Sequence, residues 1–278
     1  MTTFETTVSQ VRAEVQLIQD QIAIEEPLEI ICRYLDSGKW ISQTIGILMR
    51  TPGDDERLCL GYMYSEGIIR SAQDIDKIDS HPRYTDEDIC VDSIYVQFTT
   101  HYRWDKSRLD RKTVSGSSCG ICGHQSIDHL FVQYPYTFKK DHPTVSSEYI
   151  RSLPDLMKKH QLMFKETGGV HACGLYSSEG KLIHISEDIG RHNALDKLIG
   201  FLLENPSVHP RDYIVVLSGR AGFEMVQKTL AIGIPVILAV GAPTSLAVQM
   251  SRNFSQTLCG FVRKESFNIY SAPERIVF

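Results

Sequence analysis

The chain has 278 residues, of which 42% are hydrophobic and 23% charged, and its formal net charge is -5 at pH 7. These values are typical of an ordinary globular protein with one large domain or two modest ones. The acidic balance argues against general nucleic-acid binding, and no apolar run is long enough to cross a bilayer. An N-terminus without the layout of a secretory signal, and an odd number of cysteines, predict a cytoplasmic protein without a disulfide framework.

The first hundred residues are predicted to be rich in strands. Runs 28–35 and 40–49 are β-prone, and the turn sequence between them predicts a hairpin. A short helix is expected after residues 52–55, with Leu58, Tyr62 and Met63 on one face, followed by a strand within 88–99. The segment before Glu25 fits either a helix or a strand, and its periodicity does not decide between them.

The second half alternates apolar strands with amphipathic helices. Strands are expected at 181–185, 213–217, 234–240, 258–262 and 267–270, and helices from about 193, at 223–232 and at 245–253. This order predicts an α/β fold built on a largely parallel sheet with helices on both faces. We place the boundary between a strand-rich N-terminal domain (1–110) and an α/β domain (111–278) in the polar, basic segment near residue 110. Right-handed crossovers would bring the loops 218–220 and 241–244 to one rim of the sheet, where open α/β sheets bind ligands.

Two cysteines in the glycine- and serine-rich run 115–124 are the strongest candidates for chemistry. Cys119 and Cys122 form a Cys-x-x-Cys pair. Because glycines and serines surround them, the thiols are not expected to pack in a core, and this points first to thiol chemistry. One thiol can hold a transferred sulfur while the other resolves it by exchange. A redox pair and a zinc site completed by His124, His171 or Cys173 are the alternatives.

Two further clusters lie downstream. In 167–173 a glycine pair precedes His171, which could move a proton or bind an anion; the order of motifs is the reverse of that in zinc deaminases. In 187–193, Arg191 and His192 could contact an anion, while Asn193 could simply cap a helix.

The predicted rim carries groups suited to phosphate. Arg220 offers a guanidinium fork beside backbone amides, and Lys228 lies on the helix that follows. In the closing turn, Phe261 could stack on a base while Arg263 and Lys264 meet phosphates. A solvated hairpin tip is an equally good interpretation of this turn from its composition.

Taken together, these motifs resemble the FdhD family, the sulfur carrier proteins required to make formate dehydrogenases active. The resemblance covers most of the chain and rests on the following segments: 26–28, 50–54, 65–69, 119–123, 167–172, 187–197, 218–220, 224–228 and 260–262.

The resemblance implies a larger part similar to the cytidine-deaminase fold, an α/β/α sandwich, without deaminase chemistry. It implies a sulfurtransferase that accepts persulfide sulfur from a cysteine desulfurase and passes it to molybdenum or tungsten held by two pyranopterin guanine dinucleotides, for formate dehydrogenase. This cofactor is the bound acceptor, and no permanent cofactor or metal is expected. On this pattern Cys119 is the persulfide carrier and Cys122 its partner. The family's cofactor-contacting stretch falls on Phe261, Val262, Arg263, Lys264, Glu265 and Ser266, and family members are typically homodimers.

Three features depart from the family pattern. The turn at 33–39 is longer than expected, 103–112 carries more charge, and Cys173 stands where alanine is expected. A buried, inert thiol is the simpler interpretation of Cys173. Two other hypotheses stay open: a protein that binds and delivers the molybdenum cofactor without covalent sulfur transfer, and a zinc protein.

Overall fold

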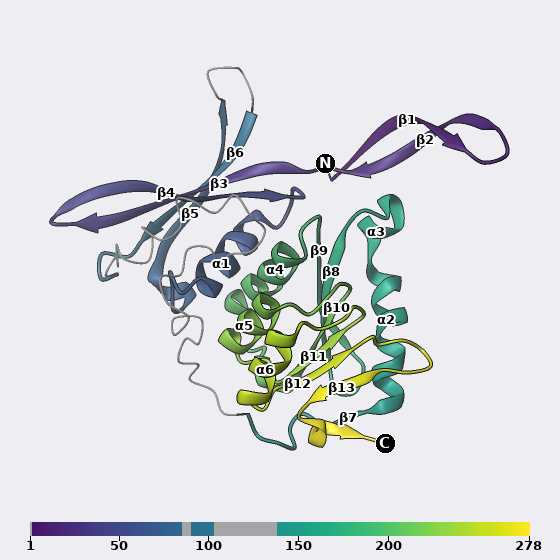
Figure 1. Cartoon of the computed structure of the whole chain (residues 1–278). Coiled ribbons are helices and arrows are strands. Elements are labelled where there is room, and N and C mark those ends of the chain that lie inside the picture. The colour runs from purple at the N-terminus through teal and green to yellow at the C-terminus, as the bar shows by residue number, and fades with distance from the viewer. Residues whose placement is uncertain (1, 85–89, 103–137) are drawn as a thin grey trace.

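The computed structural model describes residues 2–84, 90–102 and 138–278 of the chain. Within these residues, a four-stranded sheet with one helix lies beside a six-stranded sheet covered by helices, and a two-stranded hairpin projects away from both (Figure 1). The predicted fold class, an α/β/α sandwich with a smaller strand-rich N-terminal part, is confirmed. The cysteine run 115–124 and the predicted domain boundary at residue 110 lie outside the described residues.

The projecting hairpin consists of residues 3–23 and is called the arm below. Its strands are β1 (Thr3–Val11) and β2 (Val15–Ala23), which pair antiparallel with Val11 opposite Val15. Of the two interpretations that the sequence left open for this segment, the strand is therefore correct. Among the described residues, β1 and β2 have only each other as strand partners.

The four-stranded sheet forms the core of the N-terminal part. Its strands are β3 (Glu26–Asp36), β4 (Lys39–Arg50), β5 (Ile75–Tyr84) and β6 (Cys90–Phe98), in the order β4-β3-β6-β5. The predicted hairpin is the β3–β4 pair, whose turn is formed by Ser37 and Gly38 at positive φ. The predicted short helix is α1 (Asp55–Ser65), which packs Leu58 and Met63 onto this sheet. A single 3₁₀ turn, 72–74, precedes β5.

The six-stranded sheet has the order β13-β12-β11-β10-β8-β9. Its strands are β8 (His171–Ser177), β9 (Leu182–Asp188), β10 (Tyr213–Leu217), β11 (Val236–Ala239), β12 (Thr257–Gly260) and β13 (Asn268–Ser271). Only the β10–β11 and β11–β12 pairs are parallel, and the other three are antiparallel. The prediction of a largely parallel sheet is therefore wrong. The reason is local: β8–β9 and β12–β13 are joined by turns too short for the crossover that a parallel pair needs.

Helices cover both faces of this sheet, as predicted. Helices α2 (Ser147–His160) and α3 (Leu162–Thr167) lie on one side, and α4 (Arg191–Glu204), α5 (Phe223–Ile232) and α6 (Ser245–Asn253) lie on the other (Figure 1). The helices on each side of the sheet pack against it through a separate apolar core. None of the described helices is both long and apolar enough to cross a membrane.

Helix α4 begins two residues earlier than predicted. Its N-cap is Gly190, so Asn193 lies in the first turn and is not the cap that the sequence suggested. The Asn193 amide instead donates to the Met49 carbonyl at 2.8 Å and to the Asp188 carboxylate at 3.0 Å.

The two parts of the molecule meet where α1 crosses α4, and we call this contact, with the adjoining charges of α5, the seam. Two glycines make the close crossing possible. A Cβ on Gly61 would lie 1.8 Å from the Asp196 carbonyl oxygen, and a Cβ on Gly200 would lie 2.1 Å from that of Arg57. Any larger residue would force the helices apart.

Buried ion pairs complete the seam. Lys228 Nζ lies 2.8 Å from both carboxylate oxygens of Asp196, which also accepts a hydrogen bond from Ser65 at 2.8 Å. Lys197 Nζ lies 2.8 Å from the Asp188 carboxylate and donates to the Thr51 carbonyl at 3.0 Å. Each buried charge thus has a partner, as burial in protein requires.

Residues 275–277 bond to residues 139–146, the first described residues of the α/β part. The buried Arg275 guanidinium donates to the carbonyls of Lys139, His142 and Ser255 at 2.6, 3.0 and 2.9 Å. The last strand, β14 (Ile276–Val277), pairs in parallel with β7 (Val145–Ser146). Two further 3₁₀ turns, 210–212 and 273–275, precede β10 and β14.

Candidate functional site

Three loops come together at one edge of the six-stranded sheet, which we call the rim. They follow the carboxyl ends of β10, β11 and β12 and comprise residues 218–220, 240–244 and 261–266. Backbone bonds join them: the Gly241 amide donates to the Gly219 carbonyl at 2.9 Å, and the Phe261 amide donates to the Gly241 carbonyl at 3.1 Å. The prediction that 218–220 and 241–244 share a rim is confirmed.

Glycine is required where these loops cross. A Cβ on Gly241 would lie 2.8 Å from both the Arg220 nitrogen and the Gly219 oxygen. A Cβ on Gly260 would lie 2.7 Å from the Pro243 ring. The rim is therefore backbone packed on backbone, which leaves amide groups close to the surface where a ligand can approach.

The electrostatics of the rim favour an anion. Helices α4, α5 and α6 all begin there, and a helix N-terminus carries a partial positive charge. Arg191 lies in the first turn of α4, and its side chain packs beside Gly219. Arg220 and Lys264 are exposed on the loops, and neither is in an ion pair among the described residues. These charges are available to a bound ligand.

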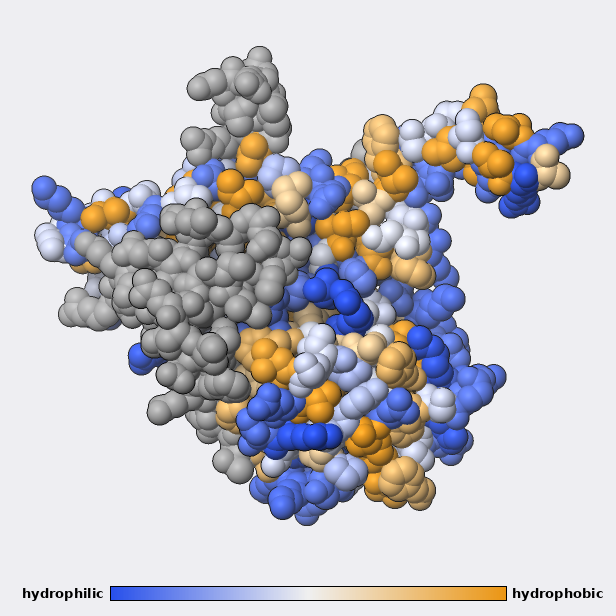
Figure 2. Space-filling view, in the orientation of Figure 1, coloured by the Kyte–Doolittle hydropathy of each residue, from blue (hydrophilic) through white to orange (hydrophobic). Residues whose placement is uncertain are grey.

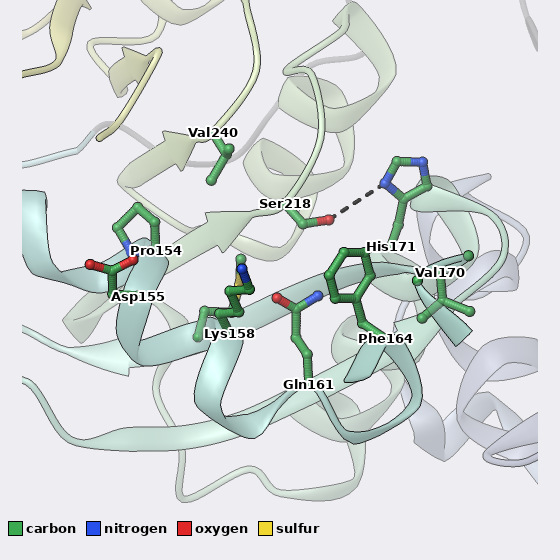
Figure 3. A pocket seen from close by; sticks show the side chains of 12 residues that line it. Pro154, Asp155, Lys158, Gln161, Phe164, Val170, His171, Ser218 and Val240 are labelled. Carbon is green, nitrogen blue, oxygen red and sulfur yellow. Dashed lines mark hydrogen bonds between the residues drawn. The ribbon is translucent and has the colours of Figure 1, made fainter. Parts of the chain in front are cut away.

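A cavity of about 430 Å³ opens beside the rim, between α2–α3 and the sheet (Figure 3). Helix α2 contributes Lys158, the residue between the helices is Gln161, and α3 contributes Phe164. The sheet side contributes His171 and Ser218, which face these helices across the cavity (Figure 3). An aromatic ring, an amide and an ammonium group in one recess suit a flat heterocycle attached to phosphate.

His171 is held as a neutral ring. Burial lowers its pKa, and the nearby Arg191 and His192 lower it further. Its Nδ1 lies 3.4 Å from the Ser218 hydroxyl, which accepts a hydrogen bond from the Ala172 amide at 2.9 Å (Figure 3). A neutral imidazole offers one donor and one acceptor, so His171 can hydrogen-bond a ligand or accept a proton.

The predicted cofactor-contacting stretch forms a tight turn on the rim. The Arg263 amide donates to the Ser266 carbonyl at 2.9 Å, and Phe261 has a positive φ of 54 with 45% of its surface exposed. Arg263, Lys264, Glu265 and Ser266 are exposed, whereas the Val262 side chain is buried in the core beneath the turn. Val262 could therefore meet a ligand only through its backbone.

Arg263 connects this turn to the cavity. Its Nη1 donates to the carbonyl of Val240, which lines the cavity, at 2.6 Å, and to that of Val262 at 2.8 Å. The guanidinium group is thereby fixed at the cavity's edge.

Several charged residues that the sequence singled out have structural roles. Lys228 is buried in the seam with Asp196, so it does not reach the rim. The Glu187 carboxylate accepts the first amides of α3, those of Met163 and Phe164, both at 2.9 Å. His192 lies 2.8 Å from Glu224 and so links the starts of α4 and α5.

The cysteine predictions have two outcomes. Cys119 and Cys122 lie outside the described residues, and so does His124. Cys173 is buried in the core under α4, and burial raises the pKa of its thiol, so it is inert as the simpler interpretation held. Within residues 2–84, 90–102 and 138–278, no cluster of three metal-ligating side chains is present.

Sequence reasoning missed the helical side of the cavity. Lys158, Gln161 and Phe164 lie on or between two helices that the pattern analysis did not identify. A signal existed: the Ser146 side chain caps α2 by accepting from the Tyr149 amide, and apolar residues follow at helical spacing. Pro154 within α2 obscured it.

Comparisons with known proteins agree with this geometry. The model of the FdhD/NarQ family matches residues 23–277. The sulfur carrier protein FdhD of Sulfurisphaera tokodaii is 39% identical over 273 residues, which cover 97% of each chain. That of Thermoplasma volcanium is 41% identical over 259 residues, covering 93% of this chain and 90% of the relative. A crystal structure from Desulfotalea psychrophila, of a protein described as a formate dehydrogenase accessory protein, superposes with a TM-score of 0.72 at 25% identity over the full length of both chains.

Proposed function

The chain belongs to the FdhD/NarQ family, and on that premise we propose that it is a sulfurtransferase that carries persulfide sulfur on Cys119. A cysteine desulfurase supplies the sulfur, and the acceptor is the molybdenum or tungsten cofactor with two pyranopterin guanine dinucleotides that serves formate dehydrogenase. The observation that carries this proposal is the Cys-x-x-Cys pair in a chain 39–41% identical to relatives named sulfur carriers. The odd count of seven cysteines supports a reducing, cytoplasmic location.

The proposed sulfur transfer consists of two thiol exchange steps, and atoms and electrons balance in each. The Cys119 thiolate attacks the outer sulfur of the desulfurase persulfide; the sulfur–sulfur bond breaks, and the desulfurase cysteine leaves as a thiolate. The Cys122 thiolate then attacks the inner sulfur of Cys119, which forms a disulfide and releases hydrosulfide to the metal of the acceptor. The released sulfur gains two electrons, the two cysteines lose them, and a dithiol reductant restores the pair.

The rim and the cavity support the second half of the proposal. The cofactor is the substrate here, a large anion with two guanine dinucleotides. Its phosphates suit the exposed Arg220 and Lys264 and the helix N-termini at the rim. The cavity beside them, with Phe164 and Gln161 in its wall, suits a guanine base. The turn 261–266 belongs to the rim, and its Arg263 donates to the carbonyl of the cavity-lining Val240, so the turn can contact the pyrophosphate.

Persulfide formation is tested by mass spectrometry. Incubation of the full chain with a cysteine desulfurase and cysteine should add one sulfur atom to the peptide that contains Cys119. Cys119→Ser should abolish the adduct, whereas Cys173→Ala, which changes a buried thiol, should leave it intact. Absence of added sulfur from both Cys119 and Cys122 would refute the proposal.

A second candidate is a protein that delivers the cofactor without covalent transfer, and the cation-rich rim favours it independently. It predicts that cells carrying Cys119→Ala keep formate dehydrogenase activity while cells carrying Arg263→Ala lose it. Loss of activity in both variants would favour sulfur transfer. For either candidate we propose formate dehydrogenase and a second copy of this chain as protein partners, and the sulfur-transfer candidate adds a cysteine desulfurase.

A further inference from the structure

The cavity beside the rim contains a buried amide without a hydrogen-bond partner. Gln161 is only 5% exposed, and its side chain points into the cavity between Lys158 and Phe164 (Figure 3). In the part of the chain that the structure describes, neither its amide oxygen nor its amide nitrogen bonds to another residue. A buried amide without partners costs free energy. A ligand in the cavity that offers both a donor and an acceptor would remove this cost.

A carboxylate lines the same cavity. Asp155 precedes Lys158 by three residues on α2 and Lys159 by four, and these are the spacings at which opposite charges pair on a helix. Neither pair forms, and Asp155 has no other ion-pair partner among the described residues. Asp155 and Lys158 both line the cavity instead. The helical wall therefore offers an acceptor, an amide with both functions and a donor.

This wall is held in place before any ligand arrives. The Glu187 carboxylate accepts the amides of Met163 and Phe164, both at 2.9 Å, and so fixes the start of α3. The base of the arm lies against the loop after α3, because a Cβ on Gly169 would lie 3.9 Å from that of Ala23. The outer part of the arm stands clear of the body (Figure 2). A wall supported in this way presents its polar groups without a cost of reorganisation.

The polar groups match one kind of heterocyclic edge. A 2-amino-4-oxopyrimidine ring presents an amino group, a ring N–H and a carbonyl oxygen side by side. A carboxylate accepts from the two donors, an amide pairs with the N–H and the carbonyl, and an ammonium group donates to the carbonyl. Adenine has an unprotonated ring nitrogen in place of the N–H, and this nitrogen cannot donate to a carboxylate. Hypoxanthine keeps the N–H and the carbonyl but lacks the amino group.

We propose that this cavity selects the 2-amino-4-oxopyrimidine edge, with Asp155 and Gln161 as the specificity-determining residues. Asp155 accepts from the amino group, and Gln161 pairs with the ring N–H and the carbonyl. The proposed substrate contains this edge twice over, in the guanine of each dinucleotide and in the pterin part of each pyranopterin. The inference rests on the proposed function for the identity of the cofactor, and it adds the residues that recognise the ring.

Isothermal titration calorimetry of the full chain tests the selection with two pairs of probes. One pair is guanosine diphosphate and inosine diphosphate, and the other is pterin and pteridin-4-one; the second member of each pair lacks the amino group. The wild type should bind guanosine diphosphate or pterin at least about tenfold more tightly than its deamino analogue. The pair that shows this preference identifies the source of the ring, and either result supports the inference.

Variants assign the preference to residues. Asp155→Ala should bring the affinities for the two members of that pair to within about twofold of each other. Glu166→Ala removes an exposed carboxylate of α3 that does not line the cavity, so it should leave the preference unchanged. Gln161→Leu should weaken binding of both members about tenfold, because both keep the N–H and the carbonyl. Asp155 is exposed, so its variant gives an answer even if the buried Gln161→Leu fails to fold.

Three results would overturn the inference: binding of none of the probes, equal affinity of the wild type for both members of each pair, or a preference that persists in Asp155→Ala. Sulfur loading of the wild type, measured by mass spectrometry, separates this failure from failure of the proposed function. Loading of Cys119 without ring selection overturns the inference alone. Ring selection without loading overturns the proposed sulfur transfer alone.

Discussion

The seam and the rim treat charge in opposite ways. At the seam, Lys228 and Lys197 are buried, and each ammonium group lies 2.8 Å from a carboxylate. At the rim, Arg220 and Lys264 are exposed and have no carboxylate partner among the described residues. Charge that is already neutralised can hold two parts of a protein together, whereas charge without a partner can bind something that arrives from solution. The difference assigns stability to the seam and ligand binding to the rim.

Removal of one carboxylate from the seam should give the largest effect. Asp196→Ala leaves the buried Lys228 ammonium without its partner, and we expect the free energy of unfolding to fall by about 3–5 kcal/mol. Urea denaturation followed by circular dichroism measures it. The double variant Asp196→Leu with Lys228→Met removes both charges and should recover most of the loss. A single variant as stable as the wild type would show that the seam does not depend on this pair.

Loss of a rim cation should affect binding but not folding. Guanosine diphosphate is a probe for the guanosine and pyrophosphate part of each dinucleotide. Arg220→Ala and Lys264→Ala should each weaken its binding by about tenfold, or 1.4 kcal/mol. Their free energies of unfolding should stay within about 0.5 kcal/mol of the wild type, since both side chains are exposed. Isothermal titration calorimetry gives the affinity, and Arg70→Ala removes an exposed cation from the N-terminal part as a control. Equal affinity in all variants would assign the probe to another surface.

The smallest effect is a pH dependence at the edge of the seam. His184 stacks on Phe201 of α4 at 4.0 Å, and burial, aided by Arg57, lowers the pKa of His184 to about 4. Its unfolded value is about 6.5, so the unfolded chain binds more protons between these two pH values. Stability should therefore rise as pH increases from about 4 to 6.5, and this ring's share is about 1 kcal/mol after allowance for its partial exposure.

Thermal or urea unfolding of the wild type and of His184→Gln across this range isolates that contribution. Between about pH 4 and 6.5, the free energy of unfolding of the variant should rise by about 1 kcal/mol less than that of the wild type. Curves of equal slope would mean that the imidazole titrates alike in both states.

The sequence predicted the elements and the rim better than the surfaces between them. The apolar run 213–217 and the glycines at 219 and 241 indicate a buried strand and close loop crossings because each position has a strong local requirement. Strand β8 (His171–Ser177) was not among the predicted strands. Its direction relative to β10 has no local signal either, since a fully buried strand has the same composition whether its neighbour runs parallel or antiparallel.

The sequence predicted the residues of the candidate site that follow strands, but not those that depend on how helices pack. Arg220 and the turn 261–266 follow strands and could be placed by topology. Lys158 and Phe164 come from helices on the opposite side of the cavity, and their proximity to His171 depends on how those helices pack. Lys228 was misplaced because helical spacing does not tell which lysine is turned inward to a carboxylate.

The position of Arg275 bears on the order in which the protein can be completed during synthesis. The carbonyls of Lys139 and His142, and the β7 strand after them, acquire their partners only from residues 275–277. Residues 275–277 must leave the ribosome before this corner of the sandwich can close, although the four-stranded sheet has emerged long before. A polypeptide stalled before residue 275 would keep that corner open.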